Sequence, residues 1–374
     1  MPFGAALSEH PVPAVAVGEV LGELLERVGP EPDLAVLFAT GPLTGALEDV
    51  VPAVQAVLRP RTLVGSTAVS VLGGGREVEE STAIALWAGS TGQARPVRLT
   101  ARPVNEGYAV TGFPEGLVGP HTLVLLADPF SFPVDGFLDQ LATDRPDITV
   151  IGGLASSARS RGGNRLVLDD RLENDGAVGV LLEGTAATVV SQGCRPIGTP
   201  MIVTRAERSM IHELAGQPAL DRLNAAVADL PPEERMLLRG GLHMGVVVDE
   251  RRVDFTRGDF LVRNVLGADK DNGAIAVGAE IPIGTTVQFH VRDATTADED
   301  LRSLLAEAGD SAGALVFTCN GRGTNLFGVE DHDAALVAEA TGGNCAGMFC
   351  AGEVGPIGGR SFLHGFTASI VLFP

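Results

Sequence analysis

The chain has 374 residues, of which 45% are hydrophobic and 20% are charged, and its formal net charge at pH 7 is -20. This length exceeds what one ordinary hydrophobic core holds, so we expect two domains, and the composition is that of a globular protein rather than a disordered one. The negative charge disfavours nucleic acid and anionic membrane surfaces as partners, because both are bound through basic patches.

Nothing in the sequence indicates export or membrane insertion. The N-terminal residues lack a basic segment followed by an apolar core, and no uninterrupted apolar run approaches the length of a membrane helix. Four cysteines in so long and acidic a chain do not suggest a disulfide framework. We therefore expect a cytoplasmic protein.

The N-terminal part alternates between predicted helices and strands. Apolar residues at helical spacing predict a helix over residues 15–28, which stops at Gly29-Pro30. A strand over 34–38 and a helix over 43–58 follow, and Pro52 is expected to kink that helix. A strand over 62–64 then enters a loop that begins at Gly65, and the next strand covers 82–87.

The same order of elements recurs twice further along the chain. The second round has a strand over 122–126, a helix over 134–142, a strand over 148–151 and a strand over 177–182. The third has corresponding segments at 314–318, 331–340, 346–349 and 366–373. We predict three copies of a strand-helix-strand-loop-strand unit, with loops starting at Gly65, Gly153 and Ala351. Chance similarity among generic α/β units is the alternative.

A different pattern separates the second and third copies. A strand over 188–190 runs into Gln192–Gly198, helices follow Pro218 and Pro231, and strands are expected at 246–248, 260–262, 275–277 and 287–291. Asp271-Asn272-Gly273 is typical of a hairpin turn, and Thr296 with Glu299 predicts a helix N-terminus. The predicted fold is α+β, with mixed β-sheets flanked by helices in two similar halves. The predicted domains are a helical extension over 1–30 and domains over 31–188 and 189–374.

Several segments resemble the FIST domain family. The likeness rests on Gly152-Gly153 and on four longer segments: Gly193–Gly198, Gly258–Asn264, Phe317–Gly323 and Gly347–Pro356. It covers nearly the whole chain from about residue 30. The resemblance implies a FIST-N domain over 31–188 and a FIST-C domain over 189–374.

The resemblance also implies a function. FIST domains are regarded as intracellular sensory modules for small ligands, with amino acids as the first ligand class, and bacterial ones are often coupled to kinases or cyclic-dinucleotide enzymes. No residues remain outside the pair for an output domain, so we expect signalling through a protein partner. Other relatives imply two alternatives, a haem-binding nitric-oxide sensor and a protein-recognition module.

The candidate ligand site lies on the two glycine-rich loops of the third copy. Arg322, flanked by Gly321 and Gly323, offers a bidentate donor for a carboxylate, and Glu353 offers an acceptor for an ammonium group. Together they would hold an amino acid zwitterion; alternatively, they pair with each other and lock the two loops. We expect the site where loops of both halves meet. The remaining candidates are Cys319, Asn320, Cys194, Arg195, Arg263 and Asn264.

Thiol chemistry is the remaining alternative. Cys319 or Cys350 would need a base such as His243, His332 or His364, and no local signature fixes such a pair, so buried inert cysteine is the simpler interpretation. No CxxC pair suggests a metal site, and phosphate-loop and esterase signatures are absent. We therefore predict no enzyme activity and no cofactor, with haem on His332 or His364 as the alternative.

Overall fold

The computed structural model describes residues 3–105, 107–252, 254–256 and 258–374. It has mixed sheets with helices, which confirms the predicted α+β class. The chain forms two compact units: the first contains residues up to Val190 with Leu301–Leu363 and Thr367–Pro374, and the second contains Ser191–Asp300 with His364–Phe366. Among the described residues, no helix has both the length and the apolar character needed to cross a membrane.

The first unit contains the three predicted copies. Each runs strand, helix, strand, short two-stranded hairpin, strand. The first copy is β2 (Leu34–Thr40), α2 (Leu47–Val57), β3 (Thr62–Ala68), β4 (Val71–Gly73), β5 (Arg76–Val78) and β6 (Ile84–Gly89). The second is β9 (His121–Ala127), α3 (Val134–Asp144), β10 (Ile148–Leu154), β11 (Leu166–Leu168), β12 (Arg171–Glu173) and β13 (Ala177–Glu183). The third is β22 (Gly313–Cys319), α7 (His332–Thr341), β23 (Cys345–Cys350), β24 (Glu353–Ile357), β25 (Arg360–His364) and β26 (Thr367–Phe373).

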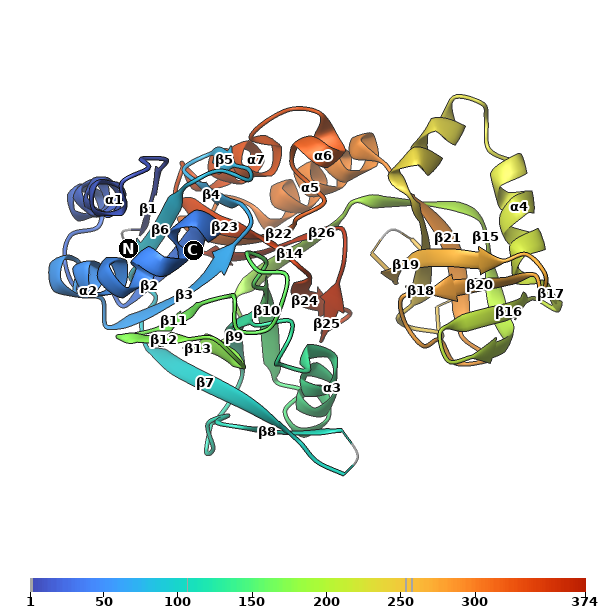
Figure 1. The fold of residues 1–374 in the computed structure, drawn as a ribbon, viewed down its shortest axis with the longest axis horizontal. Coiled ribbons are helices and arrows are strands. Elements are labelled where there is room, and N and C mark those ends of the chain that lie inside the picture. Colours follow the sequence, from blue (N-terminus) through green and yellow to red (C-terminus); the bar gives the residue numbers. More distant parts are fainter. Residues whose placement is uncertain (1–2, 106, 253, 257) are drawn as a thin grey trace. The chain divides into compact units, whose positions relative to one another are not determined.

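The copies exchange their hairpins in a circle. Within each copy the first strand pairs in parallel with the second and antiparallel with the last. The edge of each sheet is then completed by another copy: β11–β12 extends the sheet of the first copy, β24–β25 that of the second, and β4–β5 that of the third. Figure 1 shows β24 and β25 beside β10. The three copies therefore share one interlocked structure.

One glycine is required at the same place in each copy. Gly65, Gly152 and Gly347 lie opposite Leu37, Leu125 and Val316 in the parallel pairs. A Cβ atom at these glycines would lie 2.4, 1.9 and 1.9 Å from the carbonyl oxygen of the neighbouring strand. The predicted loop starts at Gly65 and Gly153 are therefore wrong, because both glycines lie inside strands, whereas the loop after β23 does begin at Ala351.

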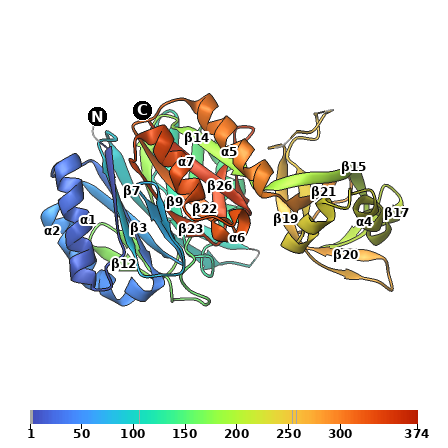
Figure 2. The same ribbon diagram turned by 90° about the horizontal axis from the view of Figure 1, so that it is seen from above.

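Side chains from all three sheets fill a common interior. This cluster includes Phe38, Val124 and Phe317 from the central strands of the three copies. Helices cover the outer faces: α1 (Pro13–Arg27) and α2 pack on the first sheet, α3 on the second, and α7 with α5 (Ala294–Ala308) on the third. Figure 2 shows α1 and α2 beside the first copy and α7 beside β22 and β23.

The segment predicted as a separate N-terminal extension is part of the first unit. β1 (Phe3–Ser8) pairs antiparallel with β6 and extends that sheet, and α1 packs its apolar face on the same sheet. The next two sheets have an added strand in the same position, namely β7 (Ala94–Pro103) beside β13 and β14 (Ala187–Gln192) beside β26. Helical periodicity identified α1 but could not reveal this pairing.

The second unit is a closed antiparallel sheet. Its strands are β15 (Cys194–Glu207), β16 (Met210–Leu214), β17 (Gln217–Pro218), β18 (Leu242–Val247), β19 (Phe260–Asp269), β20 (Ala274–Val277) and β21 (Thr286–Arg292). β15 pairs with both β21 and β16, which closes the sheet. Helix α4 (Ala219–Ala228) packs against its core, and η2 (Glu234–Gly240) follows α4 in the chain. β19 and β20 pair around Asp271–Gly273, which confirms the predicted hairpin.

Two predicted boundaries differ from the structure. The segment 189–374 is not one compact unit, because β22, β23 and β26 return to the first unit to form its third sheet. Helix α5 begins at Ala294, so Thr296 lies inside it and does not cap it. The Thr296 hydroxyl instead donates a hydrogen bond to the Asp293 carboxylate at 2.8 Å, which places the acidic side chain at the helix N-terminus.

Candidate functional site

Arg322 is completely buried and bound to a carboxylate of its own chain. Its Nε and Nη2 atoms donate to Asp333 Oδ2 and Oδ1 at 2.7 and 2.8 Å. The Thr318 hydroxyl donates to the same carboxylate at 2.6 Å. The Arg322 guanidinium holds the pKa of the buried Asp333 carboxyl well below its usual range, against the opposing effect of burial. Two of the donor groups of Arg322 are thus occupied, and its Nη1 has no hydrogen-bond partner.

Glu353 lies fully buried at the start of β24. Its Oε2 accepts hydrogen bonds from the Thr367 N–H at 3.1 Å and the Thr367 hydroxyl at 2.9 Å. Burial raises the pKa of Glu353 to about 8, although Thr367, Arg322 and Cys319 act in the opposite direction. The carboxyl is therefore mainly protonated at neutral pH and lacks the negative charge that would hold an ammonium group.

In the structure, Arg322 and Glu353 do not form an ion pair with each other. Among the described residues, Arg322 forms its ion pair with Asp333, so the alternative in which Arg322 pairs with Glu353 is wrong. The two side chains are still close enough for each charge to affect the pKa of the other. Sequence reasoning missed Asp333 because its contact with Arg322 depends on how α7 packs against the third sheet.

Carboxylates of the first copy reach this loop through the exchanged hairpin. Glu79 accepts from the Thr324 N–H and hydroxyl at 2.8 and 2.9 Å, and Glu77 accepts from the Ala334 N–H at 3.0 Å. Burial, followed by the charge of Asp333, raises the pKa of Glu77. Sequence reasoning could not find these contacts, because Glu79 and Thr324 are 245 residues apart. Gly323 is enclosed here, and a Cβ atom on it would lie 2.7 Å from Glu79 Oε1.

Two of the three cysteines of the third copy lie on adjacent strand ends. Cys319 and Cys350 are register partners at the ends of β22 and β23. Cys350 belongs to the common interior and is 0% exposed, whereas Cys319 is 7% exposed. The Gly321 N–H donates to Cys319 Sγ at 3.4 Å, and Asn320 next to it is exposed. All four cysteines, each of which the structure describes, are buried and outside disulfides.

Register identifies the equivalents of these residues in the other copies. Cys319 corresponds to Thr40 and Asp128, and Cys350 corresponds to Ala68 and Ala155. Glu353 takes the place of Val71 and Leu166, because all three precede the residue that pairs with the shared glycine. Arg322, three residues after its strand, corresponds by count to Leu43 and Ser131. The combination of Cys319, Arg322, Cys350 and Glu353 is thus not repeated in the other two copies.

The other predicted site residues lie in the second unit. Cys194 is buried in β15 and pairs in register with Arg292 of β21. Arg195 lies 2.8 Å from Glu234 and 3.2 Å from Asp293, so its charge is balanced locally. Arg263 and Asn264 are on β19, opposite Met244 and His243. A shared site of these four residues with Arg322 and Glu353 stays a prediction.

Haem on His332 or His364 stays a prediction, and so does His243 as a base for thiol chemistry. His332 stacks on Phe327 with ring centroids 3.4 Å apart, and its Nδ1 lies 3.0 Å from the Asp333 carboxylate. His243 stacks on Phe366, and His364 is 4% exposed. In the described part of the chain, no group of three or more His, Cys, Asp or Glu is arranged to hold a metal ion.

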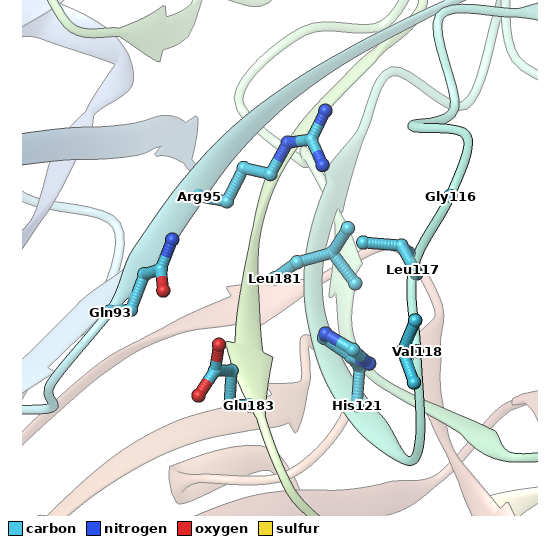
Figure 3. A pocket seen from close by; sticks show the side chains of 8 residues that line it. All are labelled: Gln93, Arg95, Gly116, Leu117, Val118, His121, Leu181 and Glu183. Carbon is cyan, nitrogen blue, oxygen red and sulfur yellow. The ribbon is translucent and has the colours of Figure 1, made fainter.

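A pocket with charged walls opens at one end of the second sheet (Figure 3). Arg95 on β7, Glu183 on β13 and His121 on β9 line it, together with apolar side chains that include Leu181 and Leu117. Figure 3 shows the Arg95 guanidinium and the Glu183 carboxylate on opposite sides of Leu181. The cavity volume is about 240 Å³, below the range of roughly 300–1,000 Å³ of sites for drug-sized ligands.

Strand register places the charged groups of this pocket on one face. Arg95 is opposite Leu181, and Glu183 is opposite His121. Leu181 and Glu183 are two residues apart on one strand, so both point to the same side of the sheet. Among the described residues, neither Arg95 nor Glu183 has an ion-pair partner. Sequence reasoning missed this pocket because its residues come from three strands and form no local motif.

Comparison with known families accounts for nearly the whole chain. The model of the FIST N domain matches residues 33–217, and that of the FIST C domain matches residues 219–356. The chain belongs to the FIST family. FIST domains are sensory and signal-transduction domains. The FIST N match extends past the predicted boundary at residue 188 and includes the first strands of the second unit.

Mycobacterial relatives align along the whole length of this chain. The uncharacterized protein Rv0628c of Mycobacterium tuberculosis H37Rv is 42% identical over 381 residues, which cover 100% of both chains. The uncharacterized protein Mb0898c of Mycobacterium bovis is 42% identical over 381 residues, which cover 100% of this chain and 99% of the relative.

Proposed function

We propose that this FIST protein is a cytoplasmic sensor that binds a small zwitterionic ligand, with α-amino acids as the first class, and signals through a protein partner. The observation that supports the proposal is the pocket of Figure 3, where Arg95 and Glu183 face a shared cavity without an ion-pair partner among the described residues. We propose no catalytic activity for this pocket.

The charge arrangement matches the two ends of an amino acid. The Arg95 guanidinium would bind the ligand carboxylate through two parallel hydrogen bonds, and the Glu183 carboxylate would bind the ammonium group. Leu181 and Leu117 would contact the aliphatic part of the ligand, and His121 would add one polar contact. The small cavity favours a single amino acid over a peptide.

This location replaces the predicted pair of Arg322 and Glu353. Arg322 already binds Asp333, and Glu353 is buried with a raised pKa, so neither is well suited to a charged ligand. None of the four pockets described in this structure is lined by Arg322 or Glu353.

The test is isothermal titration of the full-length protein with the common amino acids. We expect at least one to bind, and Arg95→Gln and Glu183→Gln each to weaken its binding by about tenfold or more, the loss of one charge-assisted hydrogen bond. The control is Arg171→Gln, which removes an exposed strand arginine outside the pocket and leaves affinity unchanged.

Two outcomes would contradict the proposal. One is that no amino acid binds the wild-type protein at millimolar concentration. The other is that binding survives both pocket variants and is lost in Glu353→Gln, which would return the site to the loops of the third copy.

A further inference from the structure

The first observation is that two cysteines of the third copy lie side by side on adjacent strands of one sheet. Cys319 and Cys350 are register partners on adjacent parallel strands. Leu315 and Phe317 of β22, and Ala346, Met348 and Cys350 of β23, all face the common interior, so strand alternation directs both thiols to this face. Neighbouring strands lie about 4.8 Å apart, which falls within the Cα separation of about 4.4–6.8 Å that a disulfide spans.

The second observation concerns the polar and charged groups next to the Cys319 thiol. Its Sγ accepts the Gly321 N–H, and the Arg322 guanidinium is near enough to interact with it electrostatically. A backbone donor and a nearby cation stabilise the thiolate, which is the reactive form of cysteine. Cys319 retains 7% exposure, whereas Cys350 behind it has none, so the two thiols differ in their access to a small oxidant.

The third observation comes from the internal repeat. The other copies build the same strands and loops with Thr40 and Asp128 in place of Cys319, and with Ala68 and Ala155 in place of Cys350. Packing alone therefore does not require a thiol at either position. Cys350 also fits against Gly153, where a Cβ atom would lie 2.3 Å from its Sγ.

We infer that Cys319 and Cys350 form a dithiol site that hydrogen peroxide oxidises to a disulfide. The Cys319 thiolate attacks one peroxide oxygen, so that an S–O bond forms and the O–O bond breaks. The departing hydroxide takes a proton and leaves as water. Cys350 then attacks the sulfur of the Cys319 sulfenic acid and its thiol proton passes to the departing hydroxyl group; the S–S bond forms, the S–O bond breaks, and a second water leaves. In total, two thiols and one peroxide give one disulfide and two waters.

Glu353 is placed to supply the first proton. It is within interaction range of both Cys319 and Cys350, and its raised pKa keeps it mainly protonated at neutral pH. Glu353 acts here as a positioning and proton-holding residue. The limited exposure of Cys319 favours hydrogen peroxide over bulky organic hydroperoxides. The inference does not use the pocket of Figure 3.

The experiment treats the folded, reduced full-length protein with hydrogen peroxide, blocks the remaining thiols, and maps peptides by mass spectrometry. We expect a disulfide between Cys319 and Cys350 that dithiothreitol reverses, and oxidation of Cys319 at least tenfold faster than of the buried Cys194 and Cys345.

Matched variants separate the two steps. Cys350→Ala introduces the alanine that the other two repeats have at this position, and it should leave a Cys319 sulfenic acid that dimedone traps. Cys319→Thr introduces the residue type of its first-copy equivalent, Thr40, and should abolish oxidation of Cys350. Removal of Cys194 or Cys345 should leave the disulfide unchanged. The inference is overturned if the folded wild-type protein keeps all its thiols under peroxide, or if Cys319 in Cys350→Ala reacts no faster than Cys194.

Discussion

At the scale of single residues, the decisive feature is that Arg322 forms a buried ion pair with Asp333. Both side chains are 0% exposed, so each charge depends on the other for its solvation. Buried ion pairs of this kind contribute little net stability, yet breaking one leaves an isolated charge in the interior. The pair therefore fixes the position of the loop between β22 and α7.

The Arg322–Asp333 pair gives a stability prediction. Arg322→Met should lower the free energy of unfolding by about 3–5 kcal/mol, because Asp333 would remain buried without its counter-charge. Chemical denaturation measures the change. The double variant Arg322→Met with Asp333→Asn should recover at least half of the loss, because the buried charge is removed and the Thr318 hydroxyl keeps an acceptor. A single variant as stable as the wild type would contradict the proposed role of this pair.

At the scale of elements, the shared glycine explains how the parallel strands of each copy approach each other. The carbonyl oxygens of Leu125 and Val316 occupy the space in which a side chain at Gly152 or Gly347 would begin. Neither carbonyl can move without loss of ladder hydrogen bonds. Packing therefore requires glycine at these positions, whereas it does not require glycine on exposed helix faces.

Alanine substitutions distinguish the two kinds of glycine. Gly347→Ala should lower the free energy of unfolding by about 1–3 kcal/mol or more, because the added methyl group overpacks the backbone of β22. The control is Gly18→Ala in α1, where nothing lies within 4 Å of the added Cβ. That change should raise stability by about 0.5–1 kcal/mol through helix propensity. Thermal and urea unfolding measure both; equal effects would refute the packing argument.

Sequence patterns predicted the elements of the copies better than their connections. Strands and helices such as β2, α1 and α7 followed from local apolar periodicity, and recurrence of that order revealed the three copies. The hairpins could not be assigned to their sheets, because each of their strands has only three to five residues and pairs with a distant copy. The pocket residues Arg95 and Glu183 depend on the same non-local register.

The candidate site shows the same division. The sequence located Arg322, Glu353, Cys319 and Cys350 on two adjacent loops because glycine-rich segments follow predicted strands. The choice of Asp333 as the partner of Arg322 depends on how α7 packs on its sheet, and the protonated state of Glu353 depends on burial. Helix packing and burial both depend on residues far apart in the sequence, so charge complementarity alone suggested the wrong pair.

At the scale of the whole molecule, the two units should respond to pH in opposite directions. In the first unit, burial raises the pKa of Glu353 from 4.5 to about 8. In the second, burial lowers the pKa of His243 and His290 from 6.5 to about 4, and the Arg292 charge adds to the effect at His243. Each shifted group links folding to proton binding.

The signs follow from which state holds the proton. Between pH 4.5 and about 8 the folded first unit keeps a proton on Glu353 that the unfolded chain releases, so its stability falls as pH rises. Between about pH 4 and 6.5 the unfolded second unit binds protons that folded His243 and His290 exclude, so its stability increases with pH. Each group contributes up to about 1.4 kcal/mol per pH unit.

Hydrogen exchange at several pH values, corrected for intrinsic rates, measures both trends. Protection of β22–β24 should decrease from pH 5 to 8, and protection of β18 and β21 should increase from pH 4 to 6.5. Glu353→Gln should weaken the first trend, to which the raised pKa of Glu77 also contributes, and leave the second unchanged. If protection against hydrogen exchange changes with pH in the same direction in both units, these pKa assignments are contradicted.

The circular exchange of hairpins also constrains the order of assembly during synthesis. The sheet of the first copy acquires its last strands once residue 173 has been made, but β4 and β5 must wait for β23, which is made more than 260 residues later. The second sheet likewise lacks its edge until β24 leaves the ribosome. A nascent chain of this protein therefore carries unpaired sheet edges for most of its translation. During that interval it is most prone to aggregation and depends most on chaperones.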